Sequence, residues 1–445
     1  MKYIALTIGP IYKTLKNSKK TRELWGGSYI FSYIMKKIIE KFKDRKFITP
    51  YVDNTVFESG KEVGLFHDRF IFESTNDTKE SVQKVIDEVL KELSNNTPLS
   101  FEFLKAYLQI NHLEIELDDS KNPILEITPY LDSLEQFYTI GHYKDNELSN
   151  MLKNNNSFLI KDAFGTKRKD FPSLPELALR DFQELWQKEE DEAFKDKRLK
   201  PCHKYIAIVH ADGDSMSEVI KDATKLSQTS KDLFDFCIAS HEKIKAFGGQ
   251  TIFAGGDDLL FFAPVVSSGK TIFELLDEIS KSFNDKFNPK ATLSFGASIT
   301  YYKHPLYEAL ENSRNLLFAK AKEMPKNNIA FEVIKHSGQT FGGVIHKGSN
   351  SYEKFLSFVS IEKSLDDNFL HSLHHKIDLH KITFESIKTD KNKLENFFKN
   401  YFNEAGHEAY REFFAKLIEY MISEQNLQNI YATLRFIKFI KGDKQ

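Results

Sequence analysis

Cysteine is scarce in this chain, and its scarcity excludes several kinds of site. The 445 residues include Cys202 and Cys237 and no other cysteine. Neither a disulfide framework nor a zinc site of four thiolates can therefore form within the chain. No catalytic histidine pattern flanks either cysteine, so both are interpreted as structural thiols. We expect a protein of the reducing cytoplasm.

Long apolar segments are also missing. The longest uninterrupted apolar run, residues 259–266, is far shorter than the roughly 20 residues that a membrane helix needs. Residues 3–8 are apolar, but they lack a cleavage pattern and lysines follow at once. Neither a signal peptide nor a membrane partner is expected.

Charge of one sign does not predominate over the whole chain. The 62 Lys and Arg residues nearly balance the 64 Asp and Glu residues, so no overall field attracts nucleic acid. The first 50 residues nevertheless hold twelve Lys or Arg and three acidic residues. This end is either a phosphate or RNA surface or a solvated helix face whose charge is offset by acids elsewhere, and the sequence leaves both open.

The hydrophobic pattern predicts two α/β units. The first has strands at 3–8, 65–73 and 112–117 and helices at 21–42 and 80–93. The second has a strand at 205–210, a helix at 230–247, a hairpin at 251–262, a helix at 271–287, a strand at 292–300 and a helix at 305–322. The second order is close to that of a split βαβ palm.

One further segment lies between the two predicted units, and another follows the second unit. Polar, charge-dense sequence predicts a helical or loop insert, and the aromatic spacing near the C-terminus predicts a helical domain. We expect an α/β (α+β) protein with two ferredoxin-like palms face to face. The expected domains are a first palm at 1–143, an insert at 144–200, a second palm at 201–337 and a helical domain at 338–445.

Two acidic turns about 45 residues apart are the strongest chemical signal. Asp212 follows a predicted strand, and Asp257 and Asp258 occupy the tip of a predicted hairpin. If the hairpin lies beside that strand, the three carboxylates converge and suit Mg²⁺ or Mn²⁺. Two such ions can activate a ribose hydroxyl and stabilise a leaving pyrophosphate. The alternative for the glycine-rich turn alone is an ordinary hairpin.

Residues beside the acids are candidates for binding a nucleotide. The backbone N–H groups from Gly213 onward, with Asp214 and Ser215, are expected to hold a triphosphate. Gly255 and Gly256 would let a phosphate or base approach closely. Lys320 would supply an ammonium group to a triphosphate, and the alternative for it is a surface lysine.

These motifs resemble a known family. Asp212-Gly213-Asp214, the turn at 255–258 and Ala319-Lys320 are similar to the GGDEF/cyclase-type palm. They are closer still to the large polymerase/cyclase subunit of type III CRISPR effector complexes of the Cmr kind. Ile-Gly-Pro-Ile at 8–11, the segment 20–28 and Ser-Tyr at 32–33 resemble the first palm of that subunit, where Gly27 and Ser28 are implied to border the nucleotide.

The resemblance implies a function. When the complex binds target RNA, the second palm would join ATP to an acceptor and release pyrophosphate, making a signalling nucleotide. The implied partners are other subunits of the complex, guide RNA and target RNA. The implied products are cyclic or linear oligoadenylate, or an AMP conjugate of S-adenosylmethionine.

The sequence departs from the family pattern in three ways. The first palm starts at residue 3, so the HD nuclease domain common in the family is not expected. The insert has no cysteine to hold zinc before Cys202, and the first palm has no Gly-Gly-Asp-Asp turn, as in the family's degenerate palm.

Asp68 is a candidate for choosing the acceptor. The resemblance places the strand that carries it against the pocket between the palms, and many relatives carry Asn there. A carboxylate would attract the cationic S-adenosylmethionine, or else it forms a surface salt bridge with Arg69 or another cation. His67-Asp68 is not interpreted as an HD nuclease dyad, because no further ligands accompany it on helices.

The sequence is also compatible with two other functions, and it contains one further cluster of histidines. The chain could be a catalytically silent scaffold of the guide-RNA complex or a free-standing diguanylate-type cyclase. The first needs no acidic set, and the second is weakened by the two-palm length and the lack of a sensor domain. His371, His374, His375 and His380 are interpreted as polar surface residues rather than a metal site.

Overall fold

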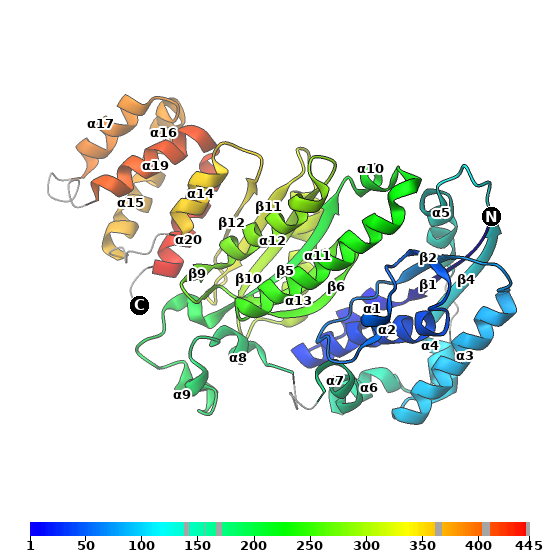
Figure 1. The fold of residues 1–445 in the computed structure, drawn as a ribbon. Coiled ribbons are helices and arrows are strands. Elements are labelled where there is room, and N and C mark those ends of the chain that lie inside the picture. Colours follow the sequence, from blue (N-terminus) through cyan, green and yellow to red (C-terminus); the bar gives the residue numbers. More distant parts are fainter. Residues whose placement is uncertain are drawn as a thin grey trace.

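The computed structural model describes residues 1–137, 141, 143–154, 156–165, 171–360, 367–402 and 410–441. The described residues form two α/β palms and a C-terminal group of helices, arranged in a row with the second palm in the middle (Figure 1). Among the described helices, none is both long and apolar enough to cross a membrane. The predicted fold class is confirmed.

The first palm is built on a four-stranded antiparallel sheet. Its strands lie in the order β2-β3-β1-β4, and α2 and α3 contribute to the core on one face. Its elements are β1 (Lys2–Gly9), α1 (Ile11–Lys16), α2 (Thr21–Lys41), β2 (Lys46–Thr49), β3 (Arg69–Glu73), α3 (Lys79–Asn96), α4 (Phe101–Tyr107), β4 (Gln109–Glu116) and α5 (Pro123–Glu135).

The second palm has a six-stranded sheet in the order β12-β11-β10-β5-β7-β6. All neighbouring pairs are antiparallel except β10 and β11. Its elements are β5 (Tyr205–Asp214), α10 (Met216–Ile220), α11 (Leu226–Ala246), β6 (Gln250–Gly255), β7 (Asp258–Pro264), β8 (Val266–Ser267), β9 (Lys270–Thr271), α12 (Ile272–Phe287), β10 (Thr292–Tyr301), α13 (Leu306–Leu316), β11 (Asn328–Ile334) and β12 (Thr340–His346).

The two palms repeat one topology. In each, the first strand lies between the third and the fourth, and the second strand lies beyond the third, giving β2-β3-β1-β4 and β6-β7-β5-β10. This is the split βαβ arrangement expected from the sequence. The helix-hairpin-helix order therefore brings the β6–β7 turn next to the end of β5.

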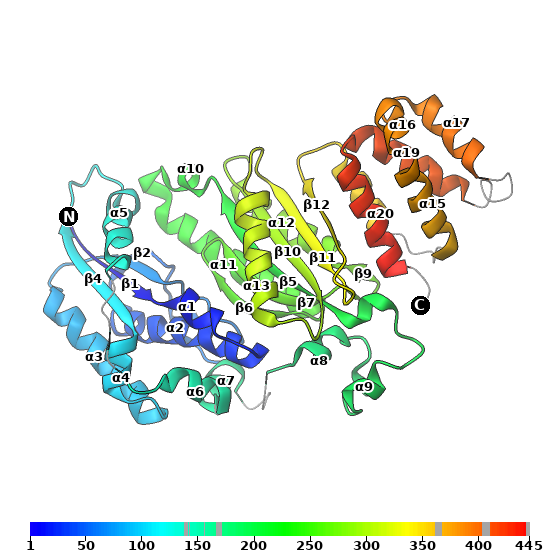
Figure 2. The same ribbon diagram turned by 180° about the vertical axis from the view of Figure 1, so that it is seen from behind.

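A shared hydrophobic core joins the palms. Successive residues of β5 point to opposite faces of the sheet, and both faces are buried. Ala207 and Val209 pack with α11 and α12, whereas Ile206 and Ile208 belong to the same core as Trp25 of α2. Viewed from behind, α2 lies on the side of the first palm that faces the second (Figure 2). The palms are thus packed face to face.

The segment between the palms consists of short helices, as predicted for residues 144–200. Leu152 of α6 and Leu159 of α7 join the core around α2, so this part packs against the first palm. The helices are α6 (Glu147–Asn154), α7 (Ser157–Phe164), α8 (Leu174–Ala178) and α9 (Glu190–Ala193).

The C-terminal helices lie on the side of the second palm that is away from the first palm (Figure 1). They are α14 (Tyr352–Val359), α15 (Asp367–Leu379), α16 (Lys381–Ile387), α17 (Lys391–Tyr401), α19 (Arg411–Glu424) and α20 (Leu427–Lys441). The aromatic stripe around Phe397 and Phe398 is buried in their core, as expected. The last four residues of the predicted domain, 442–445, lie outside the described residues.

Two sequence expectations are corrected by the strands. The expected boundary between residues 337 and 338 falls inside the turn that joins β11 to β12, because Ile334 pairs with Thr340. The helical part begins only at Tyr352. The strand predicted at 65–73 begins at Arg69, so His67 and Asp68 precede it.

Candidate functional site

The carboxyl end of β5 carries two of the predicted acids. Backbone pairing with β10 continues as far as Asp214 opposite Thr292, so β5 is longer than expected. Asp212 and Asp214 are two residues apart in this strand and therefore lie on the same face. Both contact the same lysine, as described below.

The β6–β7 hairpin presents the other acids. Gly255 pairs with Asp258 across a two-residue loop formed by Gly256 and Asp257. Gly256 has a φ of +67°, which glycine adopts without strain at the first central position of a type II′ turn. Because β7 pairs with β5, this turn lies beside Asp212.

The three predicted metal-binding acids do come together. The backbone N–H of Gly213 donates to the carboxylate of Asp257, and the side chain of Asp258 is hydrogen bonded to that of Asp212. A Cβ atom on Gly213 would lie 2.5 Å from Oδ2 of Asp257. Glycine is therefore required there, because the carboxylate takes the space of a side chain.

The surroundings of this cluster destabilise the ionised forms of Asp257 and Asp258. Burial and then the charge of Asp212 raise the pKa of Asp257 to about 6. Burial, Asp257 and Asp212 together raise the pKa of Asp258 well above its ordinary value. Although solvent reaches the side chain of Asp258, protein atoms surround it in a concave site. Such a set of hard oxygen donors with excess negative charge fits a divalent cation.

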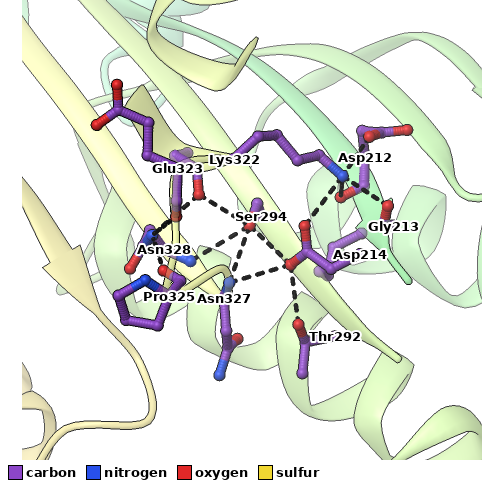
Figure 3. Close-up of polar contacts among 12 residues, drawn as sticks. Asp212, Gly213, Asp214, Thr292, Ser294, Lys322, Glu323, Pro325, Asn327 and Asn328 are labelled. Atoms are coloured by element: carbon purple, nitrogen blue, oxygen red, sulfur yellow. Dashed lines mark hydrogen bonds and ion pairs between the residues drawn. The ribbon is translucent and has the colours of Figure 1, made fainter. Parts of the chain in front are cut away.

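Lys322 supplies the one positive charge that contacts the end of β5 among the described residues (Figure 3). Its Nζ contacts Oδ2 of Asp212 and lies 3.0 Å from Oδ1 of Asp214. It also donates to the carbonyl oxygens of Asp212, at 3.1 Å, and Gly213, at 2.5 Å. Burial lowers the pKa of Lys322, but the two carboxylates outweigh this effect and raise it. The ammonium group is therefore charged at neutral pH.

Asp214 anchors the strand rather than facing a ligand. Its side chain is buried, and Oδ2 accepts hydrogen bonds from Thr292 Oγ1 at 2.8 Å, Ser294 Oγ at 2.7 Å and the Asn327 N–H at 3.1 Å (Figure 3). Ser215 is exposed and left-handed, with a φ of 59°, at the start of α10. Neither side chain lines the pocket between the palms, where a triphosphate cradle was expected.

Lys320 does not reach the acids either. It borders a different cavity, beside Glu332 and Arg435, whereas Lys322 two residues later contacts Asp212. Of the two lysines, Lys322 and not the expected Lys320 is the one that contacts the acids. A π-helical turn from Leu317 to Ala321 follows α13 and changes the direction in which each lysine points.

A pocket of about 530 Å³ lies between the palms and reaches the acidic turn at Asp258. The first palm contributes Ser28 and Asp68, as expected, while Gly27 packs beside Thr14 and Leu152 instead. Gly255 is not among the lining residues; it packs against the side chains of Phe253 and His67, which do line the pocket. The rest of the pocket wall is formed by residues that the sequence did not indicate as site residues. They include Gly9, Tyr12, Phe31, His67, Asn111, His210, Phe253 and Phe318.

The salt bridge between Asp68 and Arg69, which was one of the roles expected for Asp68, does not form. The Arg69 guanidinium pairs with Asp132 at 2.7 Å and Glu135 at 2.6 Å. Burial raises the pKa of Asp68, and burial also lowers the pKa of the adjacent His67 to about 4. The pocket therefore has carboxylates on both walls, Asp68 on the first palm and Asp258 on the second.

The side chains as they stand do not form a metal-ligating group. Among the described residues, no three His, Cys, Asp or Glu side chains meet that geometry. At the end of β5, the carboxylate of Asp212 contacts Lys322 instead. The histidines of α15 are part of the helical region, and His374 accepts a hydrogen bond from Arg435.

Comparisons with known proteins match two regions of the chain. Residues 3–97 match the family model "CRISPR-associated protein Cmr2, N-terminal", and residues 205–330 match "Cas10/Cmr2, second palm domain". The second match contains the acidic residues and Lys322. "CRISPR system Cmr subunit Cmr2" of Pyrococcus furiosus is 33% identical in an alignment 168 residues long, which covers 31% of this chain and 19% of that protein.

Solved structures show the same fold. A type III-B Cmr-beta complex bound to cognate target RNA contains a chain with a TM-score of 0.62 at 12% identity, covering 99% of this chain and 83% of that one. The apo state gives 0.58 at 12%, with 98% and 81% covered. A Csm1-Csm4 cassette in complex with cA4 gives 0.58 at 13%, with 98% and 69% covered.

Proposed function

We propose, from the premise that this chain belongs to the Cas10/Cmr2 family of type III CRISPR subunits, that its second palm is a nucleotidyltransferase. The reaction would join the adenylyl group of ATP to an acceptor, with release of pyrophosphate, once the complex binds target RNA. The product would be a signalling nucleotide.

One observation carries the proposal. Asp212 and Asp257 lie beside Asp258, which lines the end of a pocket whose other wall is the first palm, of the same topology. A scaffold has no need to place repelling carboxylates together, since burial and proximity raise the pKa values of Asp257 and Asp258 and cost free energy. Active sites are where such shifts gather. The fold relatives solved with cA4 and with target RNA support the choice of nucleotide and activator.

The proposed roles follow from the contacts. Asp212, Asp257 and Asp258 would hold Mg²⁺ or Mn²⁺, which would activate the attacking hydroxyl and neutralise the leaving pyrophosphate. The N–H of Gly213 fixes the carboxylate of Asp257. Lys322 limits the repulsion while the site is empty of substrate and is near enough to pair with a phosphate when Asp212 is otherwise engaged. The apolar walls, including Phe31 and Phe253, exclude water around the reacting groups.

The acceptor is either a second ATP, giving cyclic or linear oligoadenylate, or S-adenosylmethionine, giving its AMP conjugate. Asp68 forms no ion pair with Arg69, which pairs with Asp132 and Glu135 instead. This favours a cationic acceptor, because the Asp68 carboxylate would stabilise a neighbouring sulfonium or ammonium group. A second ATP would instead bring negative charge next to Asp68 and Asp258.

The test is mass spectrometry of products from the reconstituted complex with target RNA, ATP and Mg²⁺, with and without S-adenosylmethionine. A species that contains adenylate and methionine, and that is lost in Asp68→Asn, identifies the cationic acceptor. Oligoadenylate alone identifies ATP.

The two alternatives give different results. A double variant, Asp257→Ala with Asp258→Ala, would lose every product and keep complex assembly if the chain is an enzyme. A scaffold would give no product in the unaltered complex. A free-standing diguanylate-type cyclase would form product from GTP with the isolated chain.

A further inference from the structure

Two histidines line the pocket between the palms, and they differ in what their ring nitrogens bond. Both nitrogens of His67 are used within the protein: Nδ1 accepts the backbone N–H of Arg69 at 3.3 Å, and Nε2 donates to Thr49 Oγ1 at 3.2 Å. His210 uses one nitrogen, because its Nδ1 lies 2.8 Å from Oγ of Ser313. Among the described residues, no group bonds to its Nε2.

The hydrogen bonds around Ser313 fix the tautomer of His210. Oγ of Ser313 lies 2.8 Å from the carbonyl oxygen of Leu310, which can only accept. The single hydroxyl proton therefore goes to Leu310, and Oγ accepts its other hydrogen bond from Nδ1 of His210. His210 forms no ion pair with a carboxylate in the described part of the chain, so its ring is neutral at neutral pH. A neutral imidazole with its proton on Nδ1 presents Nε2 as an acceptor.

This acceptor is open to the pocket. His210 is half-buried, and its Nε2 is not among the polar atoms that the fold both buries and leaves without a partner. Because side chains alternate along a strand, His210 lies on the same face of β5 as Asp212, two residues further on and about 7 Å away along the strand. A nucleotide held by its phosphates at the acidic turn can therefore reach His210 with its base.

Aromatic rings border this part of the pocket. Phe318 of the second palm and Tyr12 of the first palm both line it, although 51% and 39% of their surfaces are exposed. Arg314, which follows Ser313, places its guanidinium 4.6 Å from the ring centroid of Tyr12 and 5.2 Å from that of Phe318. The rings and the acceptor thus lie in one region. Flat apolar walls with a fixed acceptor suit a heterocyclic base better than a hydrated sugar.

We propose that Nε2 of His210 accepts a hydrogen bond from the 6-amino group of adenine, and that this contact selects adenine nucleotides. This role rests on the proposed function, which supplies ATP as the nucleotide. Guanine carries a carbonyl oxygen at the corresponding position, and two acceptors that face each other cannot pair. His210 is thus a specificity-determining residue, and Ser313 is a positioning residue that holds its tautomer.

The test compares nucleotides that differ at one group. The whole chain is titrated with N-methylanthraniloyl-ATP in Ca²⁺ buffer, and the fluorescent probe is displaced by ATP or by purine riboside triphosphate, which lacks the 6-amino group. Loss of one hydrogen bond, with the acceptor left unpaired, weakens binding of this analogue about tenfold relative to ATP. N6,N6-dimethyl-ATP, which has no N–H at this position, shows a loss at least as large. This comparison does not depend on the folding of a variant.

Variants then assign the preference to one side chain. His210→Phe removes the acceptor and binds ATP and the purine analogue equally. His210→Gln supplies an amide oxygen in place of Nε2, and Ser313→Ala releases the tautomer, so each keeps a preference of about threefold. The matched control is His67→Phe in the same pocket. It keeps the tenfold preference, because both nitrogens of His67 already bond within the protein.

The outcomes separate this role from the proposed function. A preference for ATP that survives in His210→Phe overturns the role, as does equal binding of ATP and the purine analogue by the unaltered chain. Absence of ATP binding overturns both. Adenine-selective binding without product from the reconstituted complex and target RNA rejects the proposed function and keeps the role of His210. Product without selective binding does the reverse. Thermal unfolding of each variant checks that the fold is kept.

Discussion

Lys322 and Asp214 form a buried ion pair, with 3.0 Å between Nζ and Oδ1, at the point where β5 ends. The same ammonium group contacts Asp212, which faces the candidate metal site. One lysine therefore links the acid that anchors the strand to an acid proposed to react.

Replacing Lys322 by Met should destabilise the protein. The carboxylate of Asp214, buried with 2% of its surface exposed, would keep its hydrogen bonds but lose its counter-charge. Removal of one partner from a buried ion pair costs about 3 kcal/mol. Lys320→Met is the matched control and should change stability by less than about 0.5 kcal/mol. Urea unfolding measures both, and equal stabilities would contradict the assigned role.

The pair of substitutions Asp257→Asn and Asp258→Asn should abolish product and raise stability in buffer free of divalent metal. The amides keep the shape of the turn and remove the repulsion with Asp212. A rise in Tm of about 2–4 °C is expected. Asp285→Asn, at an exposed position of α12, serves as control. A lower Tm in the double variant would show that repulsion is not the dominant interaction.

Gly213→Ala should impair activity while the protein stays folded. The new Cβ would lie 2.5 Å from Oδ2 of Asp257 and 2.8 Å from Cγ of Met216, so the carboxylate must move. Gly27→Ala is the control, because its Cβ would meet Thr14 at 3.4 Å, an ordinary contact. Product formation and circular dichroism measure the two effects. Full activity in Gly213→Ala would exclude a fixed position for Asp257.

Stabilisation by Mg²⁺ should depend on pH. The pKa of Asp257 is about 6 in the folded protein, against an ordinary value of 3.8. The folded state therefore holds the proton more tightly, and stability from this group is lost as pH rises through about 6. Mg²⁺ binds the charged form, so its addition should raise Tm little at about pH 5 and more at about pH 7.5.

Thermal unfolding with and without Mg²⁺ at both pH values checks this expectation. The Asp257→Asn variant should lose most of the difference between them. A shift of equal size at both pH values would mean that Mg²⁺ binds elsewhere.

The sequence predicted the order of strands and helices in the second palm as far as α13, because these elements have clear apolar periods, but it did not predict β2 of the first palm. It also indicated the meeting of Asp212 with Asp257 and Asp258, since a split βαβ order places the hairpin beside the first strand. The strands β11 and β12 were also missed, and β12 is partly exposed and contains two glycines. Its pairing with β11 is visible only in three dimensions.

Other parts of the site depend on geometry that periodicity does not encode. The π-helical turn at Leu317–Ala321 places Lys322 rather than Lys320 at the acids. The burial of Asp214 follows from side chains of β10 and from Asn327, which are distant in sequence. The position of Gly27 against α6 likewise arises from packing of the insert on α2.

The shared core makes the second palm depend on the first palm. Ile206 and Ile208 of β5 and Leu260 and Phe262 of β7 are buried on the face that the first palm helps to cover. Separation of the palms would expose these side chains to water, at about 25 cal/mol for each Å² of apolar surface. The first palm therefore cannot be removed without exposing one face of the second palm's sheet, and the two halves of the pocket are stabilised together.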